Sequence, residues 1–393
     1  MSLRADLGVA GTLFLAFNQD CSCVCVADFR GIRIWNLSTH QLCLDLPLGA
    51  ISTAKMLFCT SLVAFVGAGE QPHLTPRKLT LLNTHSNSVI QSLSFPSSVL
   101  GVQLNRRRLV ALLDRRAFVY DLESLALLGT LDTPANPRGT AALTRGGPGG
   151  EHPGAPCLLA LPAGGGAVRV YDVGKPGGGV DALCELQAHK TAVTLLEWDD
   201  EGSLLATASK KGTVVRVHAV RRSEDRALEF RRGSTPAAIT CLAFSPAGVA
   251  PRLLCAASDH GTIHVFRLHA PGSHPAARAA KSLLSAVMPG VLEPQRPLAT
   301  IRLPGRSQAA ICAVRQEVLE AAGNGAAGGG GAMEERETQL AVATAEGLLY
   351  SFRIELPAAA AEGDGEGSGS SLRHSLEGEW SLTATAAGGT AQR

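Results

Sequence analysis

The sequence predicts an all-β protein, a seven-bladed β-propeller, and three observations support this prediction. Short β-branched, strand-like runs that contain a bulky residue recur seven times along the chain. Five of the six spacings between the bulky positions lie near the ~40–45 residues of a four-stranded propeller blade. Helical periodicity is almost absent outside one insertion. The seven bulky positions are Trp35, Leu82, Tyr120, Tyr171, His218, Phe266 and Phe352.

The first expected strand lies in the apolar stretch from Leu7 to Phe17. Arg4 precedes this stretch, an arrangement also seen at the start of signal peptides. However, Asn18, Gln19 and Asp20 follow where a cleavage site would need small residues. Elsewhere no apolar run reaches the ~18–20 residues of a membrane-spanning helix. We therefore expect a strand here and a cytosolic protein.

A second shared pattern precedes several of the bulky positions. Leu204 to Ser209 is an apolar strand followed by the turn Lys211-Gly212-Thr213, and Leu253 to Ser258 is followed by His260-Gly261-Thr262. Glycine at such a turn permits positive φ in a tight hairpin. Each repeated unit is therefore expected to contain a strand, a turn and the strand with the bulky residue.

The propeller is expected to span residues 8–356 as one domain. The last spacing, of 86 residues, is explained by two insertions, at about 268–298 and 318–337. Residues 321–332 are almost all Gly and Ala, typical of a flexible loop. Residues 357–393, rich in Ala, Gly, Ser and Glu, are expected to form a disordered C-terminal tail.

The composition excludes several functional classes. Lys+Arg 36 against Asp+Glu 34 gives a net charge of +2, which argues against a nucleic-acid binder. The ten cysteines are scattered, as suits a reducing cytosol, and Cys21, Cys23 and Cys25 are expected to be small buried hydrophobes rather than metal ligands. No phosphate-binding loop, nucleophile elbow or H-E-x-x-H motif is present in the sequence. We expect neither an enzyme nor a bound cofactor or metal.

The sharpest local feature is Phe230-Arg231-Arg232-Gly233. Successive side chains of a strand point to opposite sides, so Arg231 and Arg232 are expected to serve separate pockets. Guanidinium groups beside Ser and Thr hydroxyls suit a phosphate dianion. Taken alone, however, an arginine pair fits a solvated turn better. The candidate partners are His189, Thr207, Ser209, Thr213 and Arg216 on the earlier flank, and Ser258, Thr262 and His264 on the later one.

This motif resembles the F/L-R-R-G motif of the PROPPINs, the β-propellers that bind polyphosphoinositides. The segments Phe17 to Asp20, Ala188-His189, Ala206 to Arg216 and Cys255 to His264 also resemble the family, over roughly residues 10–355 in all. The resemblance implies two rim sites for phosphatidylinositol 3-phosphate and phosphatidylinositol 3,5-bisphosphate. The first would comprise His189, Thr207, Ser209, Thr213, Arg216 and Arg231, and the second Arg232, Ser258, Thr262 and His264.

The segment from Ala277 to Met288 can be drawn as an amphipathic helix that ends at Pro289. In PROPPINs a long loop of the sixth blade at this position inserts into the bilayer. An irregular surface insertion is the alternative. The side chains expected to enter the membrane are Leu283, Leu284, Val287 and Met288.

The resemblance further implies a monomeric adaptor, recruited from the cytosol to autophagosome-precursor and endolysosomal membranes. It implies the autophagy-related lipid-transfer protein as a partner, for which Asn18 and Asp20 are weak candidates; otherwise they form a hairpin turn. One alternative is a WD-repeat interaction scaffold without lipid binding. Another is an RNA-associated propeller that uses Arg106 to Arg108 and Arg115-Arg116, although a basic turn explains these arginines more simply.

Overall fold

The structure of the protein is a computed structural model. Most of the chain forms β-strands joined by turns. Within the described residues no α-helix occurs, and none of them forms a helix long and apolar enough to cross a membrane. The described residues are 2–4 (as backbone), 12–146, 156–175, 179–220, 227–268, 294–304, 309–318, 336–356 and 372–383.

The strands form seven antiparallel sheets, each built from consecutive segments of the chain. Blade 1 contains β1 (Ser2–Arg4), β2 (Thr12–Phe17), β3 (Cys23–Asp28), β4 (Ile32–Asn36) and β5 (Leu42–Leu46). Blade 2 contains β6 (Ile51–Met56), β7 (Leu62–Gly67), β8 (Lys78–Asn83) and β9 (Ser88–Ser94). Blade 3 contains β10 (Gly101–Leu104), β11 (Arg108–Leu112), β12 (Arg116–Asp121) and β13 (Leu127–Asp132). Blade 4 contains β14 (Ala142–Leu143), β15 (Leu158–Gly164), β16 (Ala167–Asp172) and β17 (Asp181–Gln187).

The remaining three blades follow the same order. Blade 5 contains β18 (Val193–Trp198), β19 (Leu204–Ser209), β20 (Val214–Ala219) and β21 (Leu228–Arg231). Blade 6 contains β22 (Ile239–Phe244), β23 (Leu253–Ser258), β24 (Thr262–Arg267) and β25 (Ala299–Arg302). Blade 7 contains β26 (Ala310–Val318), β27 (Arg336–Thr344), β28 (Leu348–Glu355) and β29 (Arg373–Ser381).

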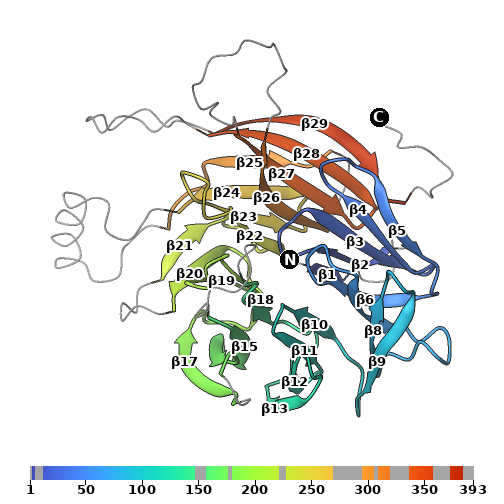
Figure 1. The fold of residues 1–393 in the computed structure, drawn as a ribbon. Coiled ribbons are helices and arrows are strands. Elements are labelled where there is room, and N and C mark those ends of the chain that lie inside the picture. Colours follow the sequence, from blue (N-terminus) through green and yellow to red (C-terminus); the bar gives the residue numbers. More distant parts are fainter. Residues whose placement is uncertain are drawn as a thin grey trace, which may run out of the picture.

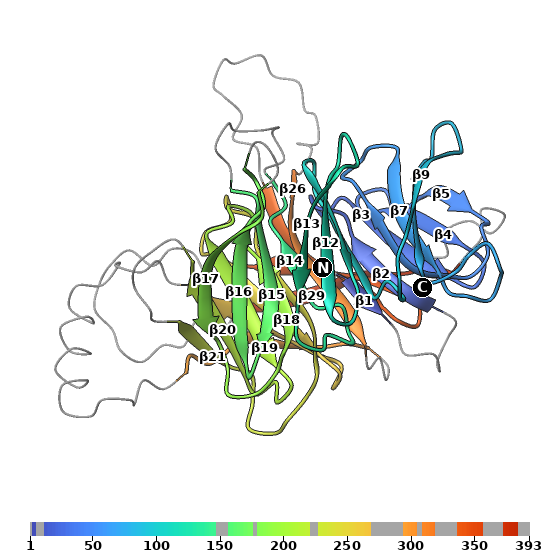
Figure 2. The ribbon, with the colours of Figure 1, turned by 90° about the horizontal axis from the view of Figure 1, so that it is seen from below.

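This arrangement confirms the predicted seven-bladed propeller. The blades follow one another around a ring, and a view turned by 90° shows strands of the green blades running between its two faces (Figures 1 and 2). The bulky positions all lie on corresponding strands, the one before the outermost strand of each blade. Neighbouring blades cover both faces of these strands, which explains why the repeated signal is apolar. The strands concerned are β4, β8, β12, β16, β20, β24 and β28.

In the part of the chain that the structure describes, the ring closes without exchanging a strand between its ends, because β26 to β29 form the last blade. A buried apolar cluster joins blade 1 to blades 6 and 7 instead. At the rim, the rings of His40 and Trp380 stack with centroids 3.6 Å apart and planes 8° from parallel. Arg315 also donates a hydrogen bond to Ser38. The red and blue strands therefore lie side by side in Figure 1.

Two described strands lie outside the expected domain boundaries of 8–356. β1 precedes residue 8 and adds a fifth strand to blade 1. β29 lies inside 357–393, where a disordered tail was expected, and pairs with β28 along eight registered positions. A disordered tail is therefore the wrong description of residues 372–383, because β28 needs an outer partner to complete its blade.

Gln19 joins the first three blades at one end of the central channel. Its side-chain amide donates to the carbonyl oxygens of Met56 and Leu104, both at 2.9 Å, and its Oε1 accepts from the backbone N–H of Phe58 at 2.6 Å. These contacts fix the turn between β2 and β3 against blades 2 and 3.

Arg145 extends this connection to the other side of the ring. It follows β14 and donates to Glu197 at 2.6 Å and to Asp200 at 3.1 Å, both in or next to blade 5. Its Nη1 also lies 3.4 Å from the carbonyl oxygen of Gln19. One arginine thus contacts segments of blades 1, 4 and 5.

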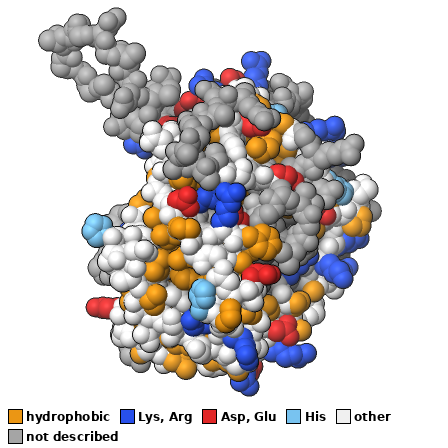
Figure 3. Space-filling view, turned by 90° about the vertical axis from the view of Figure 1, so that its right-hand side faces the viewer, with side chains coloured by type: hydrophobic (Ala, Val, Ile, Leu, Met, Phe, Trp, Pro, Cys, Tyr) orange, Lys and Arg blue, Asp and Glu red, His pale blue; other side chains and the backbone are white. Residues whose placement is uncertain are grey.

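On the side of the molecule at the right of Figure 1, basic, acidic and hydrophobic side chains are intermixed (Figure 3). Their distribution on this face agrees with the nearly balanced total charge of the chain.

Candidate functional site

Arg231 and Arg232 follow one another at the end of β21 but lie in different surroundings. Arg231 is exposed and stands opposite Val214 of β20, whereas Arg232 is only 7% exposed. Phe230, between Glu229 and Arg231, packs into the interface with blade 6, where its ring centroid lies 5.2 Å from that of Phe266. The two guanidinium groups therefore do not converge on one point.

Backbone carbonyls hold the guanidinium group of Arg232. Its Nε donates to the Gly212 oxygen at 2.8 Å, and its Nη2 donates to the oxygen of Thr235. Burial lowers the pKa of Arg232 below its ordinary value. Within the described parts of the chain, neither Arg231 nor Arg232 forms an ion pair with a carboxylate. Both remain available as cations.

The side chains predicted to surround Arg231 lie mainly on the outer three strands of blade 5, β19 to β21. Thr207 of β19, Arg216 of β20 and Glu229 of β21 stand directly opposite one another, so their side chains share one face of the sheet. Arg216 donates through Nε to Glu229 at 2.7 Å and through Nη1 to the carbonyl oxygen of Ala188 at 2.6 Å. Arg231 is on this face too, two residues beyond Glu229.

Two histidines share the hydroxyl of Thr207. Nε2 of His189 lies 2.9 Å from Thr207 Oγ1, and Nε2 of His218 lies 3.4 Å from it. Thr207 is fully buried, so in this arrangement its hydroxyl contacts the histidines rather than solvent. Burial, together with the charge of Arg216, lowers the pKa of His189 to about 4, so the imidazole is neutral at pH 7.

Ser209 and Thr213 flank the turn between β19 and β20. Ser209 is buried and its carbonyl oxygen accepts a hydrogen bond from Gly212, while Thr213 is partly exposed. Gly212 has φ of +60°, and a Cβ placed there would lie 1.8 Å from the oxygen of Ala237. Only glycine fits this turn, which positions Thr213 beside the carbonyl that holds Arg232.

The second flank is a chain of hydrogen-bonding side chains on blade 6. Ser258 Oγ lies 3.0 Å from Thr262 Oγ1, which in turn lies 3.4 Å from Nε2 of His264. The other ring nitrogen of His264 lies 3.1 Å from the hydroxyl of Thr300 on β25. Burial, with the charge of Arg232 as a second cause, lowers the pKa of His264 to about 4.

The structure therefore places the two predicted residue sets on separate blades, with Arg231 on the side of the first and Arg232 near the second. Sequence reasoning missed Glu229 and Thr300. It also missed Arg302, which is exposed and stands opposite Thr262. Strand alternation could have found Glu229, two residues before Arg231. Thr300 and Arg302 follow a long insertion, so their register could not be read from sequence.

The expected membrane-inserting residues Leu283, Leu284, Val287 and Met288 lie outside the described residues. Of the two weak partner-contact candidates, Asn18 is 4% exposed and holds the turn, accepting from the N–H of Cys23 at 2.9 Å and donating to Ser22 at 2.9 Å. Asp20 is exposed and accepts from Ser22.

The arginine clusters that suggested RNA are engaged within the fold. The Cζ atom of Arg106 lies over the ring of Phe58, 4.3 Å from its centroid. Arg108 is buried, and its Nη1 forms an ion pair with Oδ1 of Asp121 at 2.8 Å. Arg116 pairs with Asp132. These contacts favour the basic-turn interpretation.

Comparison with known proteins shows which sequence family and which solved structures this chain is similar to. The sequence model described as PROPPIN matches residues 12–316. Autophagy-related protein 18 of Yarrowia lipolytica is 37% identical over a match that covers 65% of this chain and 66% of that protein. Autophagy-related protein 18b of Arabidopsis thaliana is 35% identical, with 70% of this chain and 72% of that protein covered. The fold is similar to Kluyveromyces lactis Hsv2, with a TM-score of 0.67 at 16% identity, covering 94% of this chain and 98% of the other.

Proposed function

The chain belongs to the PROPPIN family, and from this premise we propose that it is a phosphoinositide-binding propeller that acts as a membrane-recruited adaptor in autophagosome formation. Its ligands are phosphatidylinositol 3-phosphate and phosphatidylinositol 3,5-bisphosphate, bound at two sites on the rim. The protein works by binding rather than by catalysis, and its partner is the autophagy-related lipid-transfer protein. It acts as a monomer on autophagosome-precursor and endolysosomal membranes.

One observation carries this proposal: consecutive arginines at the end of β21, one exposed and one buried, each lie beside a separate set of hydroxyl and imidazole groups. On the first side, exposed Arg231 supplies positive charge, and partly exposed Arg216 lies on the same face in an ion pair with Glu229. On the second, Arg232 lies near His264 and the hydroxyls of Ser258 and Thr262. Charge-assisted hydrogen bonds from such groups are stronger than neutral ones, which suits phosphate monoesters.

The histidines give the proposed sites a second property. His189 and His264 are neutral at pH 7 because burial lowers their pKa values to about 4. A bound phosphate dianion would raise both values by favouring the imidazolium form. In that form both ring nitrogens are donors, which suits an acceptor-only phosphate dianion.

The proposal is tested by liposome sedimentation with 3-phosphate lipid, using 4-phosphate lipid as the comparison. Exchanging Arg231 and Arg232 together for Thr should abolish binding, whereas each single exchange should only weaken it, because the other site remains and two weak sites reinforce each other. Arg116→Thr, on an exposed ion pair of blade 3, is the matched control. Unchanged binding by a folded double variant would eliminate the proposed lipid sites.

The alternative without lipid binding is a protein-interaction scaffold. In that case the arginine pair would serve only the fold, and deleting residues 277–292 would leave recruitment unaffected because no recruitment occurs. The RNA alternative predicts a steep salt dependence of RNA affinity that disappears when the five arginines of the two clusters are neutralised.

A further inference from the structure

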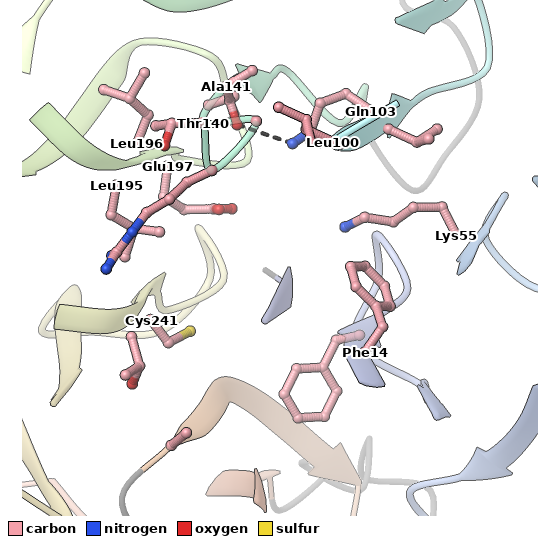
Figure 4. Close-up of a pocket in the computed structure, with 18 of the residues that line it drawn as sticks. Phe14, Lys55, Leu100, Gln103, Thr140, Ala141, Leu195, Leu196, Glu197 and Cys241 are labelled. Carbon is pink, nitrogen blue, oxygen red and sulfur yellow. Dashed lines mark hydrogen bonds between the residues drawn. The ribbon is translucent and has the colours of Figure 1, made fainter. Parts of the chain in front are cut away.

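The centre of the propeller contains a cavity of about 990 Å³, a volume within the range of small-molecule sites. β2 of blade 1 and the innermost strands of blades 2 to 6 line it, and Figure 4 shows side chains of these strands around its lumen. This cavity is separate from the rim sites proposed above, since none of their residues lines it.

Most polar side chains of this wall are already used to join neighbouring blades. Gln103 donates to the carbonyl oxygen of Ala141 at 2.9 Å, and Thr140 donates to that of Thr194 at 3.1 Å. Thr240 donates in the same way to Ala310 at 2.8 Å. Their donor groups are therefore engaged and are not the ones that a ligand would meet first.

Lys55 of β6 differs from these side chains. It is only 7% exposed, and its ammonium group points into the cavity (Figure 4). With the described residues it forms neither a hydrogen bond nor an ion pair, and its Nζ lies over the ring of Phe14, 5.9 Å from the ring centroid. A buried charge without a partner is costly, so an unpaired ammonium group calls for an anion.

The carboxylate across the cavity does not supply that anion. Glu197 faces Lys55 in Figure 4, but it is bound by Arg145 at 2.6 Å, and Asp200 is bound by the same arginine at 3.1 Å. Glu197 attracts Lys55 only across the lumen. Burial lowers the pKa of Lys55 to about 8, so the ammonium form still prevails at pH 7.

We propose that the central cavity binds a small organic molecule through an oxyanion group, a carboxylate or a phosphate, that pairs with Lys55. The ring of Phe14 beside the ammonium group would contact the apolar part of the ligand. Such a site would let a soluble metabolite bind the propeller independently of the membrane.

The test uses the full chain with ¹³C-labelled lysine, which gives few signals because the sequence has seven lysines. Inorganic phosphate and succinate are titrated separately, with sodium chloride at equal ionic strength as the reference. Either anion that binds should raise the pKa of Lys55 by about 1 or more and leave the exposed Lys175 unchanged. The anion that raises the pKa of Lys55 shows whether the site binds a phosphate or a carboxylate. If neither anion changes the pKa of Lys55, the proposal is overturned.

Variants provide an independent measurement by calorimetry. Lys55→Gln should weaken binding of the active anion at least tenfold, Lys55→Arg should retain most of it, and Lys175→Gln should bind as the wild type does. Equal binding by Lys55→Gln would also contradict the proposal. Should that variant fail to fold, the titration of the wild-type chain decides. Lys55→Gln should still sediment with 3-phosphate liposomes, so failure of one proposal can be distinguished from failure of the other.

Discussion

His218 occupies the position at which five other blades carry Trp, Tyr or Phe, yet it is a titratable group. Burial lowers its pKa to about 4, with the charges of His189 and Arg216 as further causes. The unfolded chain, in which histidine has its ordinary pKa near 6.5, therefore takes up protons first as the pH falls. The stability that depends on neutral His218 is complete above pH 6.5 and is lost between pH 6.5 and 4.

This gives a prediction for His218→Phe, which keeps a ring at this position. Between pH 6 and 4.5 the free energy of unfolding of the wild type should fall more steeply than that of the variant, by about 1.4 kcal/mol per pH unit, the contribution of one proton. Urea denaturation at several pH values measures both slopes. His85→Phe, on an exposed turn, is the control and should keep the wild-type slope. Parallel slopes for His218→Phe and the wild type would show that His218 titrates normally.

Individual residues also show where sequence reasoning stops. Strand alternation predicted different surroundings for Arg231 and Arg232, and one is exposed while the other, just beyond the end of β21, is buried. The full burial of Thr207 did not, because exposure depends on the neighbouring blade and on His189, eighteen residues earlier.

At the level of elements, the glycine turn between β19 and β20 is the best test of the hairpin prediction. Gly212→Ala should destabilise the protein by about 3 kcal/mol or more, because positive φ and a close backbone carbonyl act together. Gly165→Ala is the matched control: its φ is +56° but nothing lies within 4 Å of the added Cβ, so it should cost only about 1 kcal/mol. Chemical denaturation measures both, and equal losses would mean that the close approach to Ala237 is unimportant.

The elements that sequence could not predict are those with little apolar alternation. Residues 373–381 are largely exposed on the outer edge of blade 7, so β29 shares the polar composition of the segments around it. Its strand structure depends on pairing with β28, a long-range contact that composition does not record. The buried second strands of the blades, such as β19 and β23, are by contrast apolar along most of their length and were recognisable from sequence.

At the level of the whole molecule, Arg145 connects blades that are distant in sequence. Replacing it with Met should destabilise the protein by about 3–5 kcal/mol, because Glu197 and Asp200 would lose their cation in a buried setting. The triple replacement Arg145→Met, Glu197→Gln and Asp200→Asn should recover much of that loss, since the two carboxylate charges are then removed together with the guanidinium. Thermal unfolding of the variants measures the coupling. Additive losses would mean that the three side chains act independently.

The closure of the ring has a mechanical consequence. Among the described residues no strand of the first blade pairs with a strand of the last. A force applied across their junction, for example with optical tweezers, should therefore not have to break an interstrand ladder there. The junction should therefore part at low load, after which the sheets should peel off one at a time from the exposed end. A propeller whose first and last blades share a strand should instead stay closed until a single, higher rupture force is reached.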